Sequence, residues 1–161
     1  MSVNKDRPHV LVLPEDDANH QLANGFLLEV DSTRQRRIQV LPVAGGWNEV
    51  LNRFQVDHVN NIARCPHRFM VLLIDFDNDE DRLEAAKGAI PQNLTQRVFV
   101  LGALSEPEAL KNALGSYETI GSALARDCRE DTDTTWGHAL LRHNATELDR
   151  LRQHVRPFLF Q

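Results

Sequence analysis

The amino-acid sequence predicts a three-layer, Rossmann-like α/β fold with a mainly parallel four-stranded sheet. Four short apolar segments have the character of buried strands: 9–13, 38–43, 69–74 and 97–101. Segments with the spacing of amphipathic helices separate them. Strands that alternate with helices make βαβ units, and these give parallel sheets with helices on their faces.

Each strand is followed by residues that end it and begin a helix. The expected helices are 19–30, 48–63, a segment from Asp79 or Asp81 to Lys87, 106–114, 117–125, and one or two helices within 137–160. Ala44-Gly45-Gly46 is typical of a tight turn after the second strand. Pro107 and the acids beside it fit the start of a helix. The polar residues 127–135 are expected to form a loop.

Length and composition are those of a single globular domain. The chain has 161 residues, enough for a core that folds unaided. We expect a polar lead-in at 1–8, an α/β core at 9–115, and a helical extension at 116–161 packed on the same domain. The net charge of −5 argues against a protein that coats nucleic acid, which is usually basic, but does not exclude a nucleic-acid enzyme.

Cysteine usage and hydropathy suggest a cytoplasmic protein. Cys65 and Cys128 are far apart and form no Cys-x-x-Cys pair, which argues against a disulfide framework or a cysteine zinc site. The first residues lack the apolar segment of a signal peptide. No apolar run approaches the length that spans a bilayer, so no membrane partner is expected.

Acidic residues follow three of the four predicted strands. Glu15 follows the first, Asp75, Asp77 and Asp79 follow the third, and Glu106 and Glu108 follow the fourth. Because the carboxyl ends of parallel strands share one edge of a sheet, these groups can converge. Carboxylates repel one another unless a cation lies among them, and Mg²⁺ prefers oxygen ligands. The sequence therefore predicts a magnesium site, with helix capping as the alternative role for the aspartates.

The order of these motifs resembles the Toprim domain of topoisomerases, bacterial primases, recombination-repair proteins and a family of nucleases. The shared parts are Pro14-Glu15, Gly45-Gly46 and Asp75-Phe-Asp77-Asn-Asp79, each after a strand. The resemblance implies that Glu15 is a general acid/base or a metal ligand, that Asp75 and Asp77 hold magnesium, and that Asp79 is a more peripheral ligand. By the same resemblance, Glu108 belongs to an acidic cluster after the fourth strand, and Lys111 faces phosphate.

The chain departs from the Toprim pattern at two positions and also resembles a second family. Asp16 stands where a glycine is usual, and Asn19 stands where a second acid is common. The start of the chain is similar to a response-regulator receiver domain, in which Asp75 would accept a phosphoryl group and Asp16 and Asp17 would bind magnesium. That family expects a Lys-Pro pair that this chain lacks, and it leaves Asp77 and Asp79 without a role.

The resemblance implies a magnesium-dependent nuclease or nuclease subunit, with Mn²⁺ as an alternative metal. Nucleic acid is the expected partner, and an ATPase or other protein is a further one. Arg34 and Arg37 are candidate contacts to phosphate, which supplies most non-specific affinity for nucleic acid; a solvated loop is the other interpretation. The alternative function is a regulatory or binding module without catalysis.

Overall fold

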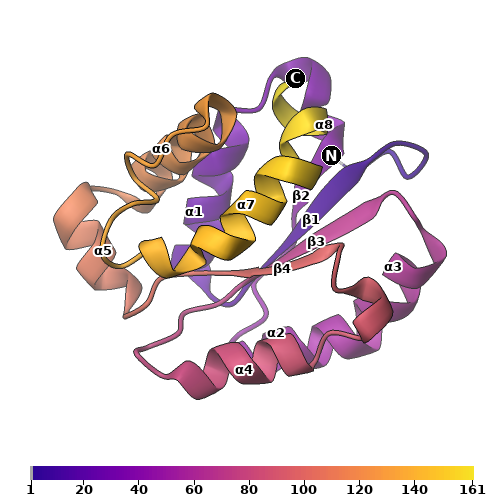
Figure 1. Ribbon diagram of the computed structural model, residues 1–161, viewed down its shortest axis with the longest axis horizontal. Coiled ribbons are helices and arrows are strands. Elements are labelled where there is room, and N and C mark those ends of the chain that lie inside the picture. The colour runs from indigo at the N-terminus through magenta and orange to yellow at the C-terminus, as the bar shows by residue number, and fades with distance from the viewer. Residues whose placement is uncertain (1) are drawn as a thin grey trace.

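A computed structural model describes residues 2–161, in which four parallel strands form one sheet in the order β2-β1-β3-β4. The strands are β1 (His9–Pro14), β2 (Ile38–Val40), β3 (Arg68–Leu73) and β4 (Val98–Leu101). β1 pairs with both β2 and β3, and β3 pairs with β4 (Figure 1). The predicted α/β fold with a parallel four-stranded sheet is confirmed.

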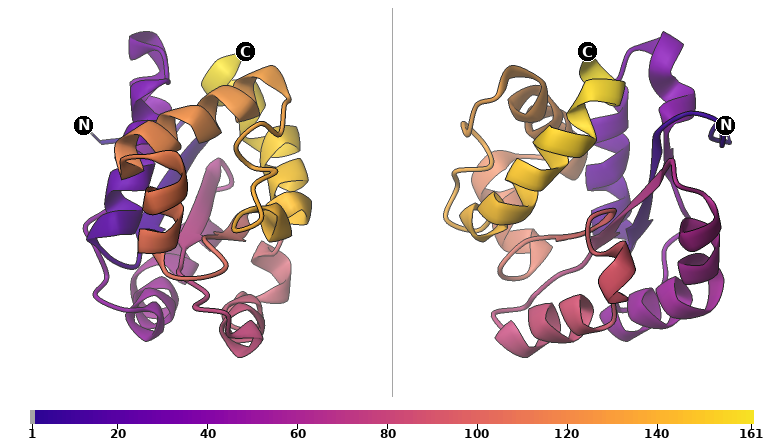
Figure 2. Two further views of the ribbon diagram at one scale, coloured as in Figure 1. Left: turned by 90° about the vertical axis from the view of Figure 1, so that its left-hand side faces the viewer. Right: turned by 45° about the vertical axis from the view of Figure 1, so that its right-hand side comes forward.

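Helices cover both faces of the sheet. In Figure 1, α1, α6, α7 and α8 lie above it and α2, α3 and α4 below it, while α5 lies beyond its carboxyl edge, as the two views of Figure 2 also show. The helices are α1 (Asp17–Leu28), α2 (Trp47–Arg53), α3 (Val59–Arg64), α4 (Glu80–Gly88), α5 (Pro107–Leu114), α6 (Tyr117–Glu130), α7 (Ala145–His154) and α8 (Arg156–Phe160). These layers make the three-layer arrangement that βαβ crossovers produce.

Two hydrophobic cores result from the alternation of side chains along the strands. Val10 and Val12 of β1 face the larger core, beneath α1 and α6 to α8. Leu11 and Leu13 face the smaller core, above α2 to α4. Successive side chains of a strand point to opposite faces, so an uninterrupted apolar strand needs both layers of helices.

Most element boundaries agree with the signals in the sequence. Asp16 caps α1, with its side chain accepting a hydrogen bond from the backbone N–H of Asn19 at 3.0 Å. Pro107 stands in the first turn of α5. The expected helix at 48–63 contains one π-helical segment, Phe54–His58, between α2 and α3. The loop expected at 127–135 is partly wrong, because α6 continues to Glu130.

Glycines allow α1 and α6 to pack with their backbones in contact. A Cβ atom added to Gly121 would lie 2.0 Å from the carbonyl oxygen of Leu22, and one added to Gly25 would lie 2.1 Å from that of Glu118. Neither neighbour is a side chain that could rotate away. The distance between these two helices therefore depends on the absence of a side chain at both positions.

Gly121→Ala should lower the free energy of unfolding by roughly 1–3 kcal/mol, because overpacking a close contact exceeds the gain in helix propensity. Gly88→Ala is the matched control, since a Cβ atom there meets nothing within 4 Å. The control should instead gain about 0.5–1 kcal/mol. Urea titration followed by circular dichroism measures both, and two variants of equal stability would contradict the packing argument.

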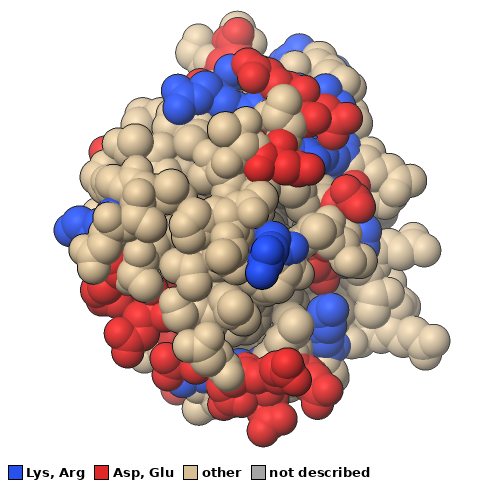
Figure 3. Space-filling view, turned by 60° about the vertical axis from the view of Figure 1, so that its left-hand side comes forward, with Lys and Arg blue, Asp and Glu red and all other residues tan. Residues whose placement is uncertain are grey.

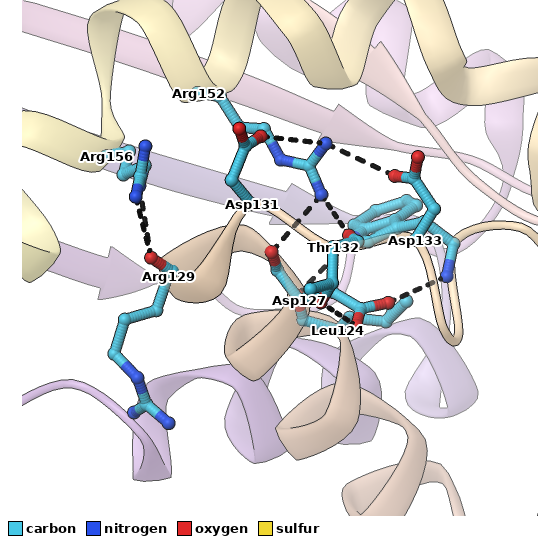
Figure 4. A network of polar contacts seen from close by, with 9 residues as sticks. Leu124, Asp127, Arg129, Asp131, Thr132, Asp133, Arg152 and Arg156 are labelled. Carbon is cyan, nitrogen blue, oxygen red and sulfur yellow. Dashed lines mark hydrogen bonds and ion pairs between the residues drawn. The ribbon is translucent and has the colours of Figure 1, made fainter.

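A polar network joins the C-terminal residues to α6 (Figure 4). Asp127 is 4% exposed, and its carboxylate accepts hydrogen bonds from the Thr132 hydroxyl at 2.7 Å and from the backbone N–H groups of Thr135 at 2.6 Å and Trp136 at 3.1 Å. The Trp136 indole donates to the Leu124 carbonyl at 3.1 Å. The loop after α6 is thus folded around one buried carboxylate, and Trp136 anchors it on the core.

Arginines of the last two helices complete this network. Arg152 of α7 donates to the carbonyl oxygens of Asp127, at 3.2 Å, and Thr132, and to the carboxylate of Asp133 at 3.2 Å. Arg156 of α8 donates twice to the carbonyl of Arg129, at 3.2 and 2.9 Å. The carbonyl groups at the end of α6 are therefore satisfied by side chains from α7 and α8, as the end of a helix requires.

The outer edge of β4 is covered by Arg150 of α7. Its guanidinium lies 4.9 Å from the centre of the Phe99 ring. The same group donates hydrogen bonds to the carbonyls of Thr95 and, at 3.5 Å, Val98. Arg150 thus occupies backbone acceptors that the edge strand would otherwise present to solvent.

Among residues 2–161, none of the helices combines the length and the apolar character needed to cross a membrane.

Candidate functional site

The carboxyl ends of β1 and β3 define the candidate site. The chain passes from β1 to β2 on one side and continues through β3 to β4 on the other, so the strand order reverses between β1 and β3. Open α/β sheets bind their ligands at such a reversal, outside the carboxyl ends of the strands. Glu15 directly follows β1, and Asp75 follows β3 by one residue, Ile74. The structure therefore brings these two predicted residues together.

Glu15 connects three loops at this point. Its carboxylate oxygen Oε2 accepts a hydrogen bond from the backbone N–H of Asp75 at 2.6 Å. Its own carbonyl accepts from the backbone N–H groups of Gly45 at 2.9 Å and Gly46 at 3.2 Å. Both glycines have positive φ, 97° and 143°, which a residue with a side chain rarely adopts. The glycine turn after β2 is therefore shaped to contact the residue that follows β1.

Burial raises the pKa of Glu15 above its usual range. The residue is 8% exposed, and loss of hydration disfavours its charged form. The hydrogen bond from Asp75 opposes the shift, the charge of Asp16 adds to it, and the positive charge of Arg82 opposes it. A carboxyl group with a raised pKa can act as a general acid/base closer to neutral pH.

Asp75 is the most perturbed acid in this group. It is 7% exposed, and its Oδ1 atom is buried without a hydrogen-bond partner in the chain. Burial, and then the charge and hydrogen bonding of Asp16 and the charge of Glu15, raise the pKa of Asp75 to about 8. Asp75 therefore holds its proton at neutral pH, because the charges of Asp16 and Glu15 add to the cost of burying its ionised form.

Asn19 and Asp16 form the α1 side of the group. The side-chain amide of Asn19 donates to Asp16 at 3.1 Å, and so does its backbone N–H. Asn19 is fully buried, and its Oδ1 atom, like that of Asp75, has no hydrogen-bond partner in the chain. Buried oxygen atoms without donors are uncommon and each calls for an explanation, of which an ion or a water molecule is one. Asp16 and Asn19 are the positions at which the sequence departs from the Toprim pattern.

The aspartates after β3 take three different roles. Asp75 points into the buried group, whereas the side chain of Asp77 is 49% exposed and lies 3.6 Å from Arg82. Asp79 caps α4, with its side chain accepting from the N–H of Asp81 at 2.9 Å. Asp77 and Asn78 both have left-handed backbone conformations, with φ of 50° and 56°. Of the three aspartates predicted to be ligands, Asp75 lies in the site and Asp77 lies at its border. Asp79 caps the N-terminus of α4.

Arg82 was not predicted and bridges two loops of the site. Its Nη1 atom donates to the Asp75 carbonyl at 3.0 Å, and its guanidinium lies 5.4 Å from the centre of the Trp47 ring, next to the glycine turn. Its Nε atom is buried without a partner.

Acidic side chains also lie on the surface near the loop that follows β3. Figure 3 shows them gathered along the lower rim of the molecule, where α4 lies. Glu80, Asp81 and Glu84 of α4 are all exposed. A cation approaching the carboxyl edge from this side meets an attractive field.

The β4 side of the site contains α5 and the start of α6. Glu108 is exposed in the first turn of α5, and the Lys111 ammonium lies 5.4 Å from the centre of the Tyr117 ring. Tyr117 is buried, and its pKa is raised by burial and then by the charges of Glu108, Asp16 and Asp75. Glu108 and Lys111 are thus at the carboxyl edge, as predicted. Tyr117 is a site residue that the sequence did not reveal.

Arg34 and Arg37 are not brought to this edge. Both belong to a 3-10 helix, Ser32–Arg37, which leads into the amino end of β2. Arg37 donates to the carbonyl of Phe158 in α8 at 2.9 Å. The predicted phosphate contacts at Arg34 and Arg37 therefore lie at the opposite end of the sheet from Glu15 and Asp75, and Arg37 has a structural contact instead.

The donor set fits a weakly coordinated metal better than a closed cage. Within residues 2–161, no three His, Cys, Asp or Glu side chains are arranged as a metal-binding group. Mg²⁺, however, is commonly bound by one or two carboxylates together with water and substrate phosphate oxygens. The oxygens of Asp75 and Asn19 that lack a hydrogen-bond partner, beside Asp16, are donors of the type that Mg²⁺ uses.

No protein-family model, curated protein or solved structure matches this chain.

Proposed function

We propose that the carboxyl edge between β1 and β3 is a magnesium-dependent site for the phosphodiester bonds of nucleic acid, and that the chain is a Toprim-like nuclease or nuclease subunit. One observation carries the proposal. The glutamate after β1 contacts both the glycine turn after β2 and the aspartate loop after β3, through hydrogen bonds of 2.6 to 3.2 Å. These are the three parts that the resemblance places in order along the sequence.

Asp75 would hold the metal with its buried Oδ1 atom, and Asp16 and Asn19 are the nearest additional oxygen donors. A bound magnesium ion would compensate the negative charge of these groups and would stabilise charge on the oxygens of a phosphoryl group. Asp77 can reach the same position only by leaving its ion pair with Arg82. The site would thus keep open positions for substrate oxygens.

Glu15 is the residue that can move a proton. Its raised pKa favours general acid/base action, and its position against the Asp75 backbone fixes the direction of its carboxyl group. Arg82 and Lys111 supply the positive charge on the two sides of the acids. Arg82 has a buried Nε–H group without an acceptor and can therefore donate a hydrogen bond to a phosphate oxygen.

The proposal is tested by cleavage of labelled single- and double-stranded DNA and RNA in the presence of Mg²⁺ or Mn²⁺. Asp75→Asn and Glu15→Gln should each lower the rate at least about 100-fold, the usual scale for loss of a general acid/base. Glu84→Gln removes an exposed acid of α4 and should leave the rate unchanged. Cleavage that survives both substitutions in the site would exclude this assignment.

Arg82→Ala should lower kcat/KM about 10- to 100-fold, the value of one charge-assisted hydrogen bond, while the affinity for Mn²⁺ stays within about twofold. Arg82→Lys keeps the charge but not the planar group and should recover only part of the loss. Free guanidinium added to Arg82→Ala should also restore part of the rate. If the loss appears instead as weaker Mn²⁺ binding, Arg82 supports the loop and does not contact phosphate.

A second candidate function, a receiver-like phosphorylation switch, is favoured by one observation. After burial, the charge and hydrogen bonding of Asp16 raise the pKa of Asp75 most. In that reading Asp75 accepts a phosphoryl group and Asp16 helps to bind magnesium, while Glu15 and the glycine turn have no assigned role. Incubation with acetyl phosphate and Mg²⁺, followed by intact mass measurement, separates the candidates, because the switch requires a phosphorylated Asp75 that Asp75→Asn cannot form.

A further inference from the structure

A cavity of about 80 Å³ lies in the larger hydrophobic core, apart from the acidic side chains of the candidate site. Its walls come from the sheet on one side and from α1, α6, α7 and α8 on the other. Val12, Ala23, Leu101, Leu124, Trp136 and Leu151 are among the side chains that line it. The cavity is therefore a property of how the two layers meet, since every element of that side contributes.

The lining of the cavity offers almost nothing to a water molecule. The residues that line it carry no charged side chain, and the indole N–H of Trp136 is already bonded to the Leu124 carbonyl. A buried water molecule needs two to four polar partners, and apolar cavities without them stay dry. The atoms of the wall therefore lack contacts on one side, and only an apolar molecule can supply these contacts.

The helices around the cavity are tied to one another. α1 and α6 already touch through Gly25 and Gly121, with backbone atoms in the way of any closer approach. α7 and α8 are tied to the end of α6 by Arg152 and Arg156. The sheet, whose strands are hydrogen-bonded to one another, forms the opposite side of the cavity. These contacts fix the backbone positions of the elements that surround the cavity.

We propose that this cavity is a binding site for a small apolar molecule without hydrogen-bonding groups. An apolar protein cavity of about 150 Å³ accepts benzene or xenon. The present cavity of about 80 Å³ is smaller and suits small apolar molecules such as xenon, chloroform or a short branched hydrocarbon. The proposal does not depend on the function of the acidic site.

Trp136 provides a direct report of occupancy because it forms part of the wall. The chain contains two tryptophans, Trp47 and Trp136, so Trp47→Phe leaves Trp136 as the only indole. Chloroform quenches indole fluorescence on contact. In this variant, chloroform should quench Trp136 along a saturable curve and should raise the melting temperature, because a ligand that binds only the folded state stabilises it. Methanol, small but polar, should do neither.

Filling the cavity supplies the control. Ala23→Leu and, independently, Val12→Ile add carbon atoms to opposite walls, and each should abolish the saturable quenching and the shift in melting temperature in the Trp47→Phe background. Using both variants covers the case in which one of them does not fold. Quenching that rises linearly with chloroform concentration overturns the proposal, and so does saturable quenching that persists in the filled variants.

Discussion

Asp75→Asn should raise the melting temperature of the metal-free protein at pH 8 and abolish its response to Mg²⁺ or Mn²⁺. The pKa of Asp75 is raised from 3.8 to about 8, first by burial and then by Asp16 and Glu15. An acid with a raised pKa contributes most to stability below its ordinary pKa, and this contribution is lost as the pH rises through the folded-state value. Asparagine has nearly the shape of aspartic acid but does not ionise, so the variant does not lose this stability as the pH rises.

The advantage of the asparagine variant should therefore grow from about pH 4 to about pH 8 and then level off. Each unit of pKa shift corresponds to about 1.4 kcal/mol, so a gain of several kcal/mol, or roughly 10–20 °C in melting temperature, is expected at pH 8. Differential scanning fluorimetry at several pH values, with and without Mn²⁺, measures this. A variant that melts below the native protein at pH 8 would show that the carboxylate is stabilising and needs no cation.

Asp77→Asn is the matched control, because it makes the same chemical change two residues away at a side chain that is 49% exposed. Surface substitutions of this kind usually change stability by less than about 0.5 kcal/mol. Added metal should narrow the difference between the native protein and Asp75→Asn, since binding to the folded state stabilises only the chain that binds. Comparing the two variants therefore distinguishes two explanations of a gain in stability. Either the buried Asp75 carboxylate is destabilising without a bound cation, or removal of any negative charge from this acidic loop stabilises the protein.

Asp127→Ala should cause the largest loss of stability among single substitutions outside the sheet. It leaves the backbone N–H groups of Thr135 and the buried Trp136 without an acceptor. Leaving a buried donor without a partner costs about 1–3 kcal/mol, so these two groups together cost about 2–6 kcal/mol, which corresponds to a decrease of roughly 4–20 °C in melting temperature. Calorimetry and circular dichroism can follow the transition.

The shape of that transition is as informative as its midpoint. If residues 116–161 belong to the same cooperative unit as the sheet, Asp127→Ala unfolds in one transition at lower temperature. If they form a separate unit, an early partial transition appears and the rest melts as before. Asp133→Ala is the control: its carboxylate accepts a hydrogen bond from Arg152, but its side chain is 69% exposed and the expected change is below about 1 kcal/mol.

The sequence predicts those features that follow from chain direction and side-chain pattern. Uninterrupted apolar runs identify the strands because a parallel sheet buries both faces. The meeting of Glu15 and Asp75 follows from the rule that ligands bind at the carboxyl edge. The same rule could have excluded Arg34 and Arg37, since residues that lead into a parallel strand lie at the opposite edge.

Other features depend on packing that the pattern does not contain. Asp127 lies in a polar run and looks like a loop residue, yet it ends up buried because the chain after α6 folds back around it. Tyr117 and Arg82 lie near the acids because of how α6 and α4 are rotated about their axes. The separate roles of Asp75, Asp77 and Asp79 arise from two consecutive left-handed residues, Asp77 and Asn78, which turn the chain out of its strand. Asp and Asn adopt the left-handed conformation more often than other residues with a side chain, but as single residues, so short-range propensity does not predict two of them in succession.

The position of Arg150 affects whether the edge strand β4 can pair with a strand of a second molecule. A sheet whose last strand is bare can grow by adding a strand from a neighbouring molecule, and such growth begins aggregation. Arg150 places a charge and two hydrogen bonds where the first backbone contacts of an added strand would form, next to Thr95 and Val98. The other edge strand, β2, has only three residues. Both open sides of the sheet are therefore poor templates for strand pairing between molecules.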